Sequence, residues 1–442
     1  GRVDPTNPAR VVRDPIPGNI IPASRVSPIS RKLVDLWPLP NRSGLTSNFQ
    51  HPNSVEDHKW KTVTSRADYM FSSANRAFVR YSEARWDYRD PDYHLNNISG
   101  GHTTKRTQRL IAIDDVHTIS PTMLLNVRFG LTYQRDVFDL FSSGINLADY
   151  GLGAIAKLSS TPGRLTLPLI NVAGMTGWRQ ALAAGNSTDN KDRLYSAGAT
   201  FNYLRGNHTF AMGFEHRHYN EYSYDDARSR SPVFEFGTGW TVGPYNTSAG
   251  VNHVHATGGF MLGNPTSGSM TVMPTREENS PRLALFLQDD WRVSRKLTLN
   301  LGLRYEIERP STEVNDASVN GIDLTTALPI EAAVKANYAK DPLPERPVNG
   351  FNIRGGVLYA GVNGRRRGLW EIRRTNFMPR IGAAWQLDSK TVLRGGYGIF
   401  YDALGVTRSD ANQTGFSRAT ILQTTLDSIR PRTDAFANPF PD

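Results

Sequence analysis

Hydrophobic and polar residues alternate strictly along several stretches of this chain. In LTLNLGLRYEIERP, residues 297–310, every second position from Leu297 to Ile307 is hydrophobic. The positions between them hold Thr, Asn, Gly, Arg and Glu. Because successive side chains of a β-strand point to opposite faces, this stretch predicts a strand with one hydrophobic face and one polar face.

The alternating stretches come in pairs, and each pair predicts a β-hairpin. The turn-forming segments SSANR, SPT, RGN, SRK and DSK join the two members of a pair. Alternating runs joined by a few such residues are typical of hairpins, so we expect about ten strands. The expected strands cover residues 61–71, 77–89, 106–119, 123–138, 193–204, 208–222, 281–293, 297–310, 376–387 and 391–404.

The connections between the hairpins are much longer than the turns within them. They span roughly 89–106, 139–192, 223–280, 309–375 and the residues beyond 404, against a usual median of about 4–6 residues in compact domains. In an up-and-down sheet, the two kinds of connection lie at opposite ends. Short turns at one end and long loops at the other are typical of an outer-membrane barrel, with periplasmic turns and extracellular loops.

The hydrophobic faces could contact either lipid or a protein core, and a single strand fits both alternatives. The asymmetry of the connections favours lipid. Aromatic residues near strand ends also favour it, because they would lie at the membrane interfaces; these are Trp291, Tyr305, Trp385 and Tyr401. We therefore predict an all-β fold, an antiparallel up-and-down transmembrane β-barrel with about ten strands of a larger barrel.

Composition narrows the remaining classes. No hydrophobic run approaches the roughly 18 residues that a membrane-spanning helix needs, and cysteine is absent from the 442 residues. A disulfide framework, a thiolate metal site and a cysteine nucleophile are thereby excluded. The net charge of +10 would suit anionic lipid headgroups, acidic glycans or nucleic acid. Nucleic acid is not expected, because the one tight basic run, Arg365 to Arg367, lies in a glycine-rich context without a basic helix.

The chain divides into three expected segments. Residues 1–59 are rich in proline and read as a connecting segment, with a short helix over 28–37 that Ser27 caps and Pro28 begins. Residues 60–405 form the barrel hairpins and their loops, and residues 406–442 form an extracellular loop or a truncated end. The opening GRVDPTNPAR has neither an initiating Met nor a hydrophobic leader core, so we expect a piece of a longer product.

Three segments carry a resemblance to a known family. LALFLQDDWRVSRKLTLNLGLRYEIERP resembles a barrel hairpin of TonB-dependent outer-membrane receptors. IPGNIIPASRVSPISRKLVDLWPLPN is similar to the segment that follows the plug in the Oar-like branch, and NFMPRIGAAWQLDSKTVLRGGYGIFYD is similar to a later hairpin of that branch. The resemblance implies a large plugged barrel in the outer membrane of a Gram-negative bacterium. No plug or coupling box precedes residue 1, and the final ANPFPD is unlike a barrel's aromatic last strand, so a middle portion of a receptor is expected.

Two functions from different classes follow from this resemblance. The first is uptake of a large ligand, siderophore-like or glycan-like, powered by the TonB complex through a plug that this chain lacks. The second is a surface structural or adhesion role of Oar type without transport. Outer-membrane lipid and lipopolysaccharide are the expected surroundings. A polar lumen wall would carry Arg128, Arg304, Glu306 and Arg394.

Catalytic and cofactor motifs find little support, and we expect no enzyme, no cofactor and no assigned site residue. GLGAIA, residues 151–156, matches a dinucleotide-binding string without the βαβ frame that would confirm it. Three aspartate pairs cannot act as carboxylate dyads within strands, because neighbours point to opposite faces; they are Asp114-Asp115, Asp225-Asp226 and Asp289-Asp290.

Histidines form the one pattern that could hold a metal. His216 and His218 lie two apart and share a face of a strand, a spacing from which two imidazoles could bind one ion. His253 and His255 repeat the spacing in the following loop. No third ligand is fixed by the sequence, so metal binding stays open.

Overall fold

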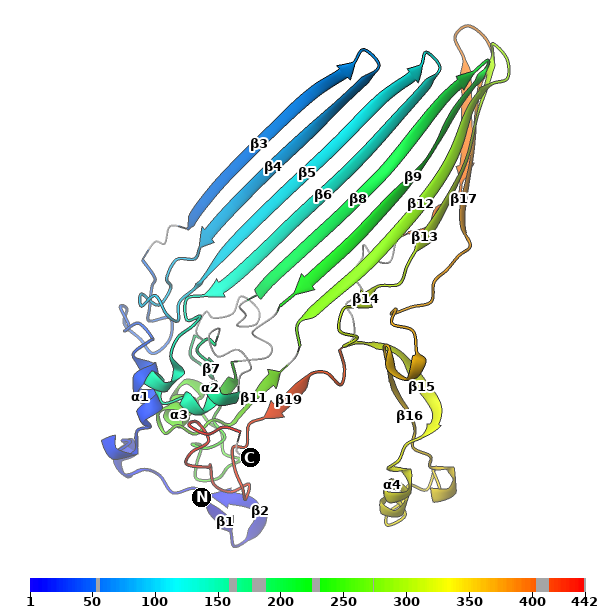
Figure 1. Cartoon of the computed structure of the whole chain (residues 1–442). Helices are drawn as coiled ribbons and strands as arrows, with labels where there is room; N and C mark the ends of the chain where they lie inside the picture. Colours follow the sequence, from blue (N-terminus) through cyan, green and yellow to red (C-terminus); the bar gives the residue numbers. More distant parts are fainter. Residues whose placement is uncertain are drawn as a thin grey trace.

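The dominant element is a broad antiparallel sheet of long, sequentially adjacent strands (Figure 1). The computed structural model describes residues 1–52, 56–158, 165–176, 188–224, 231–272, 274–402 and 413–440. The sheet has eleven strands in the order β18-β17-β13-β12-β9-β8-β6-β5-β4-β3, with β14 pairing beside β12. The strands are β3 (Asp57–Ser72), β4 (Asn75–Arg89), β5 (His102–Ser120), β6 (Met123–Leu140), β8 (Thr188–Arg205), β9 (His208–Ser223), β12 (Arg276–Arg292), β13 (Leu297–Glu308), β14 (Thr312–Glu313), β17 (Asn376–Gln386) and β18 (Val392–Gly398).

The hairpin prediction is confirmed for all five pairs. Each expected strand overlaps an observed one, and each observed hairpin pairs in antiparallel register. The five short turns gather at one end of the sheet, and the long connections gather at the other (Figure 1). We call these the turn end and the loop end.

The two faces of the sheet differ in chemistry, as the alternation predicts. Phe214, Leu285, Tyr305 and Phe377 are in cross-strand register and point to one face, the apolar face. Exposed fractions of 41% for Phe214, 48% for Leu285 and 51% for Phe377 show that none of the described segments covers it. The next positions along the same strands point to the opposite, polar face.

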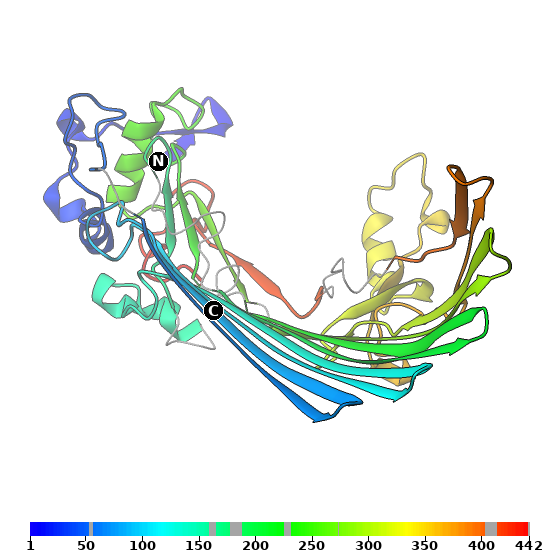
Figure 2. The ribbon, with the colours of Figure 1, turned by 90° about the horizontal axis from the view of Figure 1, so that it is seen from above.

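Glycines on the polar face explain why the sheet curves (Figure 2). Gly198, Gly213, Gly302 and Gly382 all lie there by strand register. A Cβ at Gly213 would come within 2.1 Å of the Ala199 carbonyl oxygen. Small side chains let neighbouring strands bend toward their own side, so the polar face is the concave one.

A second region, which we call the loop body, packs at the loop end around its own hydrophobic core. It is built from segments that are far apart in the sequence, including residues 23–37, 145–158, 165–172, 233–272 and 418–436. Its elements are α1 (Pro28–Val34), η3 (Leu147–Tyr150), α2 (Gly153–Leu158), β7 (Leu169–Val172), β10 (Val233–Phe236), α3 (Asn252–Met261), β11 (Ser267–Val272) and β19 (Arg418–Ile421). Strands β19, β11, β10 and β7 form a four-stranded sheet, in which β7 and β10 are parallel.

The predicted helix after Ser27 is present as α1, although it is shorter than expected. The Ser27 hydroxyl accepts a hydrogen bond from the Ser30 amide, and Pro28 occupies the first turn. Leu33 is completely buried in the core of the loop body. The expected division into residues 1–59, 60–405 and 406–442 stays a prediction.

The remaining elements are small. At the beginning of the chain lie β1 (Arg2–Asp4), β2 (Asn7–Val12), η1 (Pro17–Asn19) and η2 (Ala23–Arg25). The connection after β13 forms a separate arm with β15 (Val319–Ala327), α4 (Glu331–Tyr338), η5 (Val348–Gly350), β16 (Arg354–Tyr359) and η6 (Val362–Gly364) (Figure 1). The described residues include no helix with the length and apolarity needed to cross a membrane.

The basic run of this arm has a structural role. The Arg367 guanidinium bonds to the Asp316 carboxylate at 2.5 Å and donates to the carbonyl oxygens of Glu313 and Val314. Arg366 pairs with the Glu371 carboxylate at 2.9 Å. Both guanidinium groups therefore fasten loop segments to each other.

Candidate functional site

Five charged side chains form a continuous chain of contacts on the polar face, which we call the ionic ladder. Its members are Glu215 and Arg217 on β9, Arg282 on β12, and Arg304 and Glu306 on β13. Residues two apart on a strand share a face, and the cross-strand pair Arg282 and Arg217 is in register. Three separate strands therefore bring their charges to one place.

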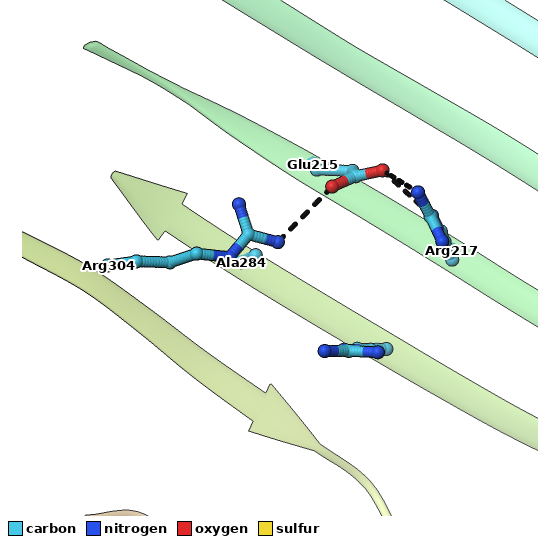
Figure 3. Close-up of a pocket in the computed structure, with 5 residues that line it drawn as sticks. Glu215, Arg217, Ala284 and Arg304 are labelled. Carbon is cyan, nitrogen blue, oxygen red and sulfur yellow. Dashed lines mark hydrogen bonds and ion pairs between the residues drawn. The ribbon is translucent and has the colours of Figure 1, made fainter. Parts of the chain in front are cut away.

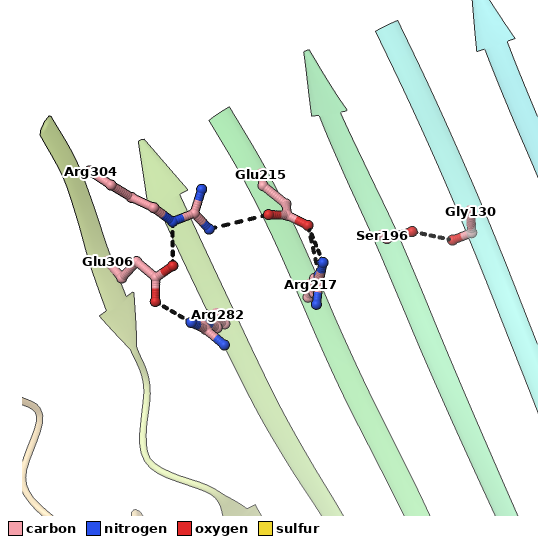
Figure 4. Close-up of polar contacts among 7 residues, drawn as sticks. All are labelled: Gly130, Ser196, Glu215, Arg217, Arg282, Arg304 and Glu306. Carbon is pink, nitrogen blue, oxygen red and sulfur yellow. Dashed lines mark hydrogen bonds and ion pairs between the residues drawn. The ribbon is translucent and has the colours of Figure 1, made fainter. Parts of the chain in front are cut away.

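The geometry of the ladder satisfies each carboxylate twice (Figure 4). The Glu215 carboxylate accepts from Arg217 Nε at 2.7 Å and from Arg304 Nη2 at 3.2 Å. The Glu306 carboxylate accepts from Arg304 Nε at 2.5 Å and also contacts Arg282. Arg304 thus bridges the two glutamates, and its planar guanidinium is suited to such divided bonding.

The ladder surrounds a small polar cavity. Its volume is about 60 Å³. It is lined by Glu215, Arg217, Arg282, Ala284 and Arg304 (Figure 3). Glu306 has only 6% of its surface exposed. Ala284 is the small residue between the charged positions, and its methyl group leaves the space open.

The ladder carries one positive charge in excess. Three guanidinium groups face two carboxylates, and arginine remains protonated at all relevant pH values. Charges at this depth require partners, and here each carboxylate has two. The arrangement can hold a polar wall rigid and offer guanidinium donors to an anionic or hydroxyl-bearing group.

The surrounding backbone is also closely packed. The Ser196 hydroxyl donates to the Gly130 carbonyl oxygen at 3.3 Å across β6 and β8 (Figure 4). A Cβ at Gly130 would meet that hydroxyl oxygen at 2.6 Å. This part of the wall has little space for a larger side chain.

The four predicted lumen residues do lie on the polar face, but they do not form one cluster. Arg304 and Glu306 belong to the ladder. Arg128 is in register with Gly198, which is in register with Glu215. Arg394 lines a separate hollow with Asn300 and Gly382.

Sequence reasoning missed Glu215, Arg217 and Arg282 as members of the site. Their alternation within β9 and β12 was available as a signal for the polar face. Their contacts with Arg304 and Glu306 depend on the register between strands, which alternation does not encode.

His216 and His218 share a face, as expected for positions two apart, and that face is the apolar one. His218 Nε2 lies 2.9 Å from Asn279 Oδ1, and His216 is in register with Leu283. Within the described ranges, no group of three or more His, Cys, Asp or Glu side chains is placed to hold a metal ion. Metal binding at this pair stays untested.

The second histidine pair, expected in a loop, lies in a helix. His253 and His255 lie in helix α3, where residues two apart point in different directions. His255 Nδ1 lies 3.0 Å from the Thr241 carbonyl oxygen, which is a packing contact within the loop body. The repeated spacing therefore does not repeat the geometry of His216 and His218.

The aspartate pairs behave as the strand argument predicts. Asp289 contacts His208 Nδ1 at 2.8 Å on the apolar face, whereas Asp290 accepts from Asn300 Nδ2 at 2.6 Å on the polar face. Asp114 likewise accepts from the Asn126 amide at 3.0 Å. The pair Asp225-Asp226 lies outside the described residues.

The GLGAIA string has a structural explanation. Gly151 has a φ of 78° and ends η3, and α2 begins two residues later at Gly153. Leu152 and Ile155 are completely buried in the core of the loop body. A positive φ favours glycine at this position. The glycine therefore forms a turn, and the two hydrophobic residues of the string pack in the core.

A comparison with known protein families gives a match over nearly the whole chain. A family model described as outer membrane beta barrel domain matches residues 2–442. No curated protein sequence matches the chain.

Three solved structures are similar to this chain over three quarters or more of its length. The outer membrane transporter YddB from Escherichia coli has a TM-score of 0.43 and 10% identity, over 83% of this chain and 35% of that one. FpvA of P. aeruginosa, bound to heterologous pyoverdines, has a TM-score of 0.38 and 9% identity, over 76% and 34%. The ferric-catecholate import receptor Fiu from E. coli has a TM-score of 0.34 and 11% identity, over 75% and 42%. The chain thus spans well under half the length of each.

Proposed function

Because the chain belongs to the outer membrane β-barrel domain family, we propose that it forms part of a receptor that takes a large ligand across the outer membrane. The observation that carries this proposal is the polar concave face with its ionic ladder, opposite an uncovered apolar face. Barrels of this class face lipid with the apolar side and enclose a polar interior. The ladder then forms part of the wall along which a ligand passes.

The sheet supports a larger barrel than the described strands form. Within the described residues, β3 pairs on one side with β4, and β18 pairs on one side with β17. Open sheet edges do not occur in the hydrocarbon region, because backbone donors and acceptors cannot be left unpaired there. Further strands beside β3 and β18 would complete the wall.

We propose that energy for uptake comes from the TonB complex acting through a plug. The support for this step is the resemblance of residues 283–310 and 376–402 to hairpins of TonB-dependent receptors. The long loops at the loop end would face the exterior, and the ligand would be siderophore-like or glycan-like.

Lipopolysaccharide is the proposed lipid partner on the exterior side. Towards the loop end, the apolar face changes from Val79 and Ile113 to a charged rim. There the Glu83 carboxylate bonds to Arg85 at 2.5 Å and to Arg109 at 2.8 Å. Guanidinium groups just beyond an apolar band can reach lipid phosphates.

A surface structural or adhesion role is the second candidate, and the loop body favours it. Completely buried Leu33, Phe234 and Ile155 give this region a packed core of its own. Long loops that only admit a ligand need no such core. A firmly packed exterior surface would suit contact with another cell or matrix.

Uptake by the bacterium separates the two candidates. We would delete the gene for the whole protein, restore it on a plasmid, and measure uptake of labelled ferric siderophores and labelled oligosaccharides with and without a protonophore. A receptor requires that uptake of one probe depends on both the gene and the proton gradient. Normal uptake of every probe by the deletion strain, together with lost surface attachment, would support the adhesion role instead.

Variants of the ladder sharpen this test. Arg304→Gln removes the bridge between Glu215 and Glu306, and we expect reduced uptake at an unchanged amount of assembled protein. Glu83→Gln is the matched control, because it disrupts an ion cluster on the apolar face. Equal uptake by wild type and Arg304→Gln would remove the ladder from the ligand path.

A further inference from the structure

Aromatic rings gather on the polar face at the loop end of β3 and β4, and we call this group the aromatic shelf. It consists of His58 and Trp60 on β3 with Trp86 and Tyr88 on β4. Trp60 is in register with Trp86, and His58 is in register with Tyr88. Cross-strand partners point to the same face, so all four rings share one surface.

Trp86 lies nearly parallel to two other rings of the shelf, while the rings of His58 and Tyr88 are tilted by 38° to each other. The ring centroids of His58 and Trp86 are 5.9 Å apart with an interplanar angle of 16°, and those of Trp86 and Tyr88 are 5.8 Å apart at 23°. Trp60 remains 62% exposed. The shelf therefore offers flat ring surface to the space beside the polar face.

Contact with lipid does not account for these rings. The strand register that places Glu215, Arg128 and Asp114 on the polar face continues through Phe78 to Trp86 and Tyr88. Interfacial aromatics of barrels point outward, on the apolar side; Trp385 and Tyr305 do so here. The rings of the shelf lie on the polar face at the loop end, so contact with lipid does not explain their position.

Planar polar groups border the shelf on β5 and β6. The Arg106 guanidinium lies 5.6 Å from the Trp86 ring centroid and donates to the Asp136 carboxylate at 2.6 Å. Gln108 donates to Gln134 at 2.9 Å, and Gln134 donates to Asp136 at 2.9 Å. Arg106 and Asp136 keep 40% and 28% of their side-chain surface exposed, so they can also bond to a ligand.

The guanidinium group beside the shelf has a carboxylate partner of its own, whereas the ionic ladder has more guanidinium groups than carboxylates. Arg106 is paired with Asp136, and the His58 ring contacts Glu56 at 3.1 Å. Among the described residues that border the shelf, no surplus of guanidinium groups like that of the ladder is present to attract an anionic iron chelate. Flat rings beside paired amide, guanidinium and carboxylate groups suit the C–H faces and hydroxyl groups of an uncharged sugar.

We propose that the aromatic shelf is a glycan-binding site at the exterior mouth of the barrel, where pyranose rings stack on Trp60 and Trp86 and their hydroxyl groups bond to Arg106, Asp136 and the neighbouring amides. This inference rests on the proposed uptake function and names its ligand class. Sugars captured at the mouth would then pass along the polar wall toward the ladder.

Binding by the whole purified protein in detergent tests the proposal. The probes are cellohexaose, xylohexaose, maltohexaose and laminarihexaose, measured by quenching of tryptophan fluorescence and by saturation-transfer NMR. We expect one or more of these to bind the wild type, and we expect Trp60→Ala and Trp86→Ala each to weaken that binding at least tenfold. Trp60→Phe keeps a flat apolar ring and should stay within about threefold of the wild type.

Two controls keep the result interpretable. Trp385→Phe changes an aromatic ring on the apolar face and should leave sugar affinity unchanged. The heat-dependent shift in electrophoretic mobility reports whether each variant still forms an assembled barrel. An assembled Trp60→Ala variant that binds its sugar as tightly as the wild type would overturn the site.

The outcome separates this inference from the uptake proposal. If the wild type binds a ferric siderophore and none of the four sugars, the glycan proposal fails while the receptor function stands. If none of these probes binds and uptake does not depend on the gene, both fail. Loss of assembly in every shelf variant would show instead that the rings pack against another part of the protein, and would also overturn the site.

Discussion

The loop body and the sheet use hydrophobic residues in opposite ways within one chain. In the loop body, Leu33 and Phe234 are completely buried against other side chains. In the sheet, Leu285 and Trp385 are about half exposed, at 48% and 51%, and no other part of the described chain covers them. In water, hydrophobic side chains are buried against one another, as in the loop body. In lipid, they can remain on the protein surface, as in the sheet.

The boundary of the membrane lies between these two regions. Between the two regions, the connection from β4 to β5 holds buried polar residues such as His94 and Ser99, both hydrogen-bonded. Polar groups that are buried and hydrogen-bonded to each other are covered by other protein groups. This connection is therefore shielded from water by protein packing and not by lipid. The boundary therefore lies near the loop end of the strands.

The largest expected effect is in the core of the loop body. Phe436 packs edge-on against Phe234 and Phe236, with centroids 4.9 and 5.3 Å away. Phe436→Ala should destabilise the loop body by about 3–5 kcal/mol, the usual cost of removing a buried ring. Hydrogen exchange of the α1 and α3 amides measures this opening. Leu426→Ala, at a residue that is 77% exposed, should change exchange little, and equal effects of the two would contradict a packed core.

A charge on the apolar face should be the next largest effect. Leu285 lies between Leu283 and Leu287 on that face. Leu285→Arg should destabilise the membrane-inserted protein by about 2–4 kcal/mol if the position is near the bilayer midplane. Chemical unfolding from lipid vesicles measures the change. Gln288→Arg, on the polar face of the same strand, should cost clearly less, and the reverse order would mean that the two faces are assigned the wrong way round.

Curvature gives a smaller, more local effect. Gly213→Ala would place a Cβ 2.1 Å from the Ala199 carbonyl oxygen and 3.0 Å from the Phe286 ring. We expect a loss of about 1–3 kcal/mol from this overpacking, seen as a lower fraction of heat-resistant folded protein on gels. Gly395→Ala serves as the control, because nothing lies within 4 Å of its Cβ position. If both substitutions were silent, the close approach at Gly213 would be wrong.

The smallest effect is a pH dependence at the boundary itself. Burial lowers the pKa of His94 below its ordinary value of 6.5, with the nearby Asp92 opposing the shift. His94 in the opened segment therefore binds a proton at a higher pH than His94 in the closed segment. The closed segment consequently becomes less stable as the pH decreases below about 6.5. The opening equilibrium of residues 92–101, taken as the amide exchange rate divided by the intrinsic rate at the same pH, should increase from pH 7 to pH 5. His94→Asn should flatten that profile, and an identical profile in the variant would assign the dependence to other groups.

The strands could be predicted from sequence because their pattern is local. Alternation from Leu297 to Ile307 identifies β13 and its two faces without reference to any other segment. The loop body could not be predicted in this way. Leu33, Ile155 and Phe436 occur in short segments rich in Gly, Pro and polar residues, and they meet only in three dimensions.

Part of the candidate site could also be predicted from the sequence, because alternation within a strand is a local pattern. Alternation assigns Arg304 and Glu306 to the polar face, where they are found. Their partners Glu215 and Arg282 depend on the register between β9, β12 and β13. A shift of one residue would have turned those charges to the other face, so only the assembled sheet defines the ladder.

The distribution of the loop-body core along the chain also sets an order of assembly. Ile29 and Leu33 are among the earliest core residues to be synthesised, and Phe436 is among the last. Contacts between such distant residues close large loops and form slowly. The core of the loop body can therefore be completed only after the strands between these segments have been synthesised, so a folded loop body indicates that the chain is present from Ile29 to Phe436.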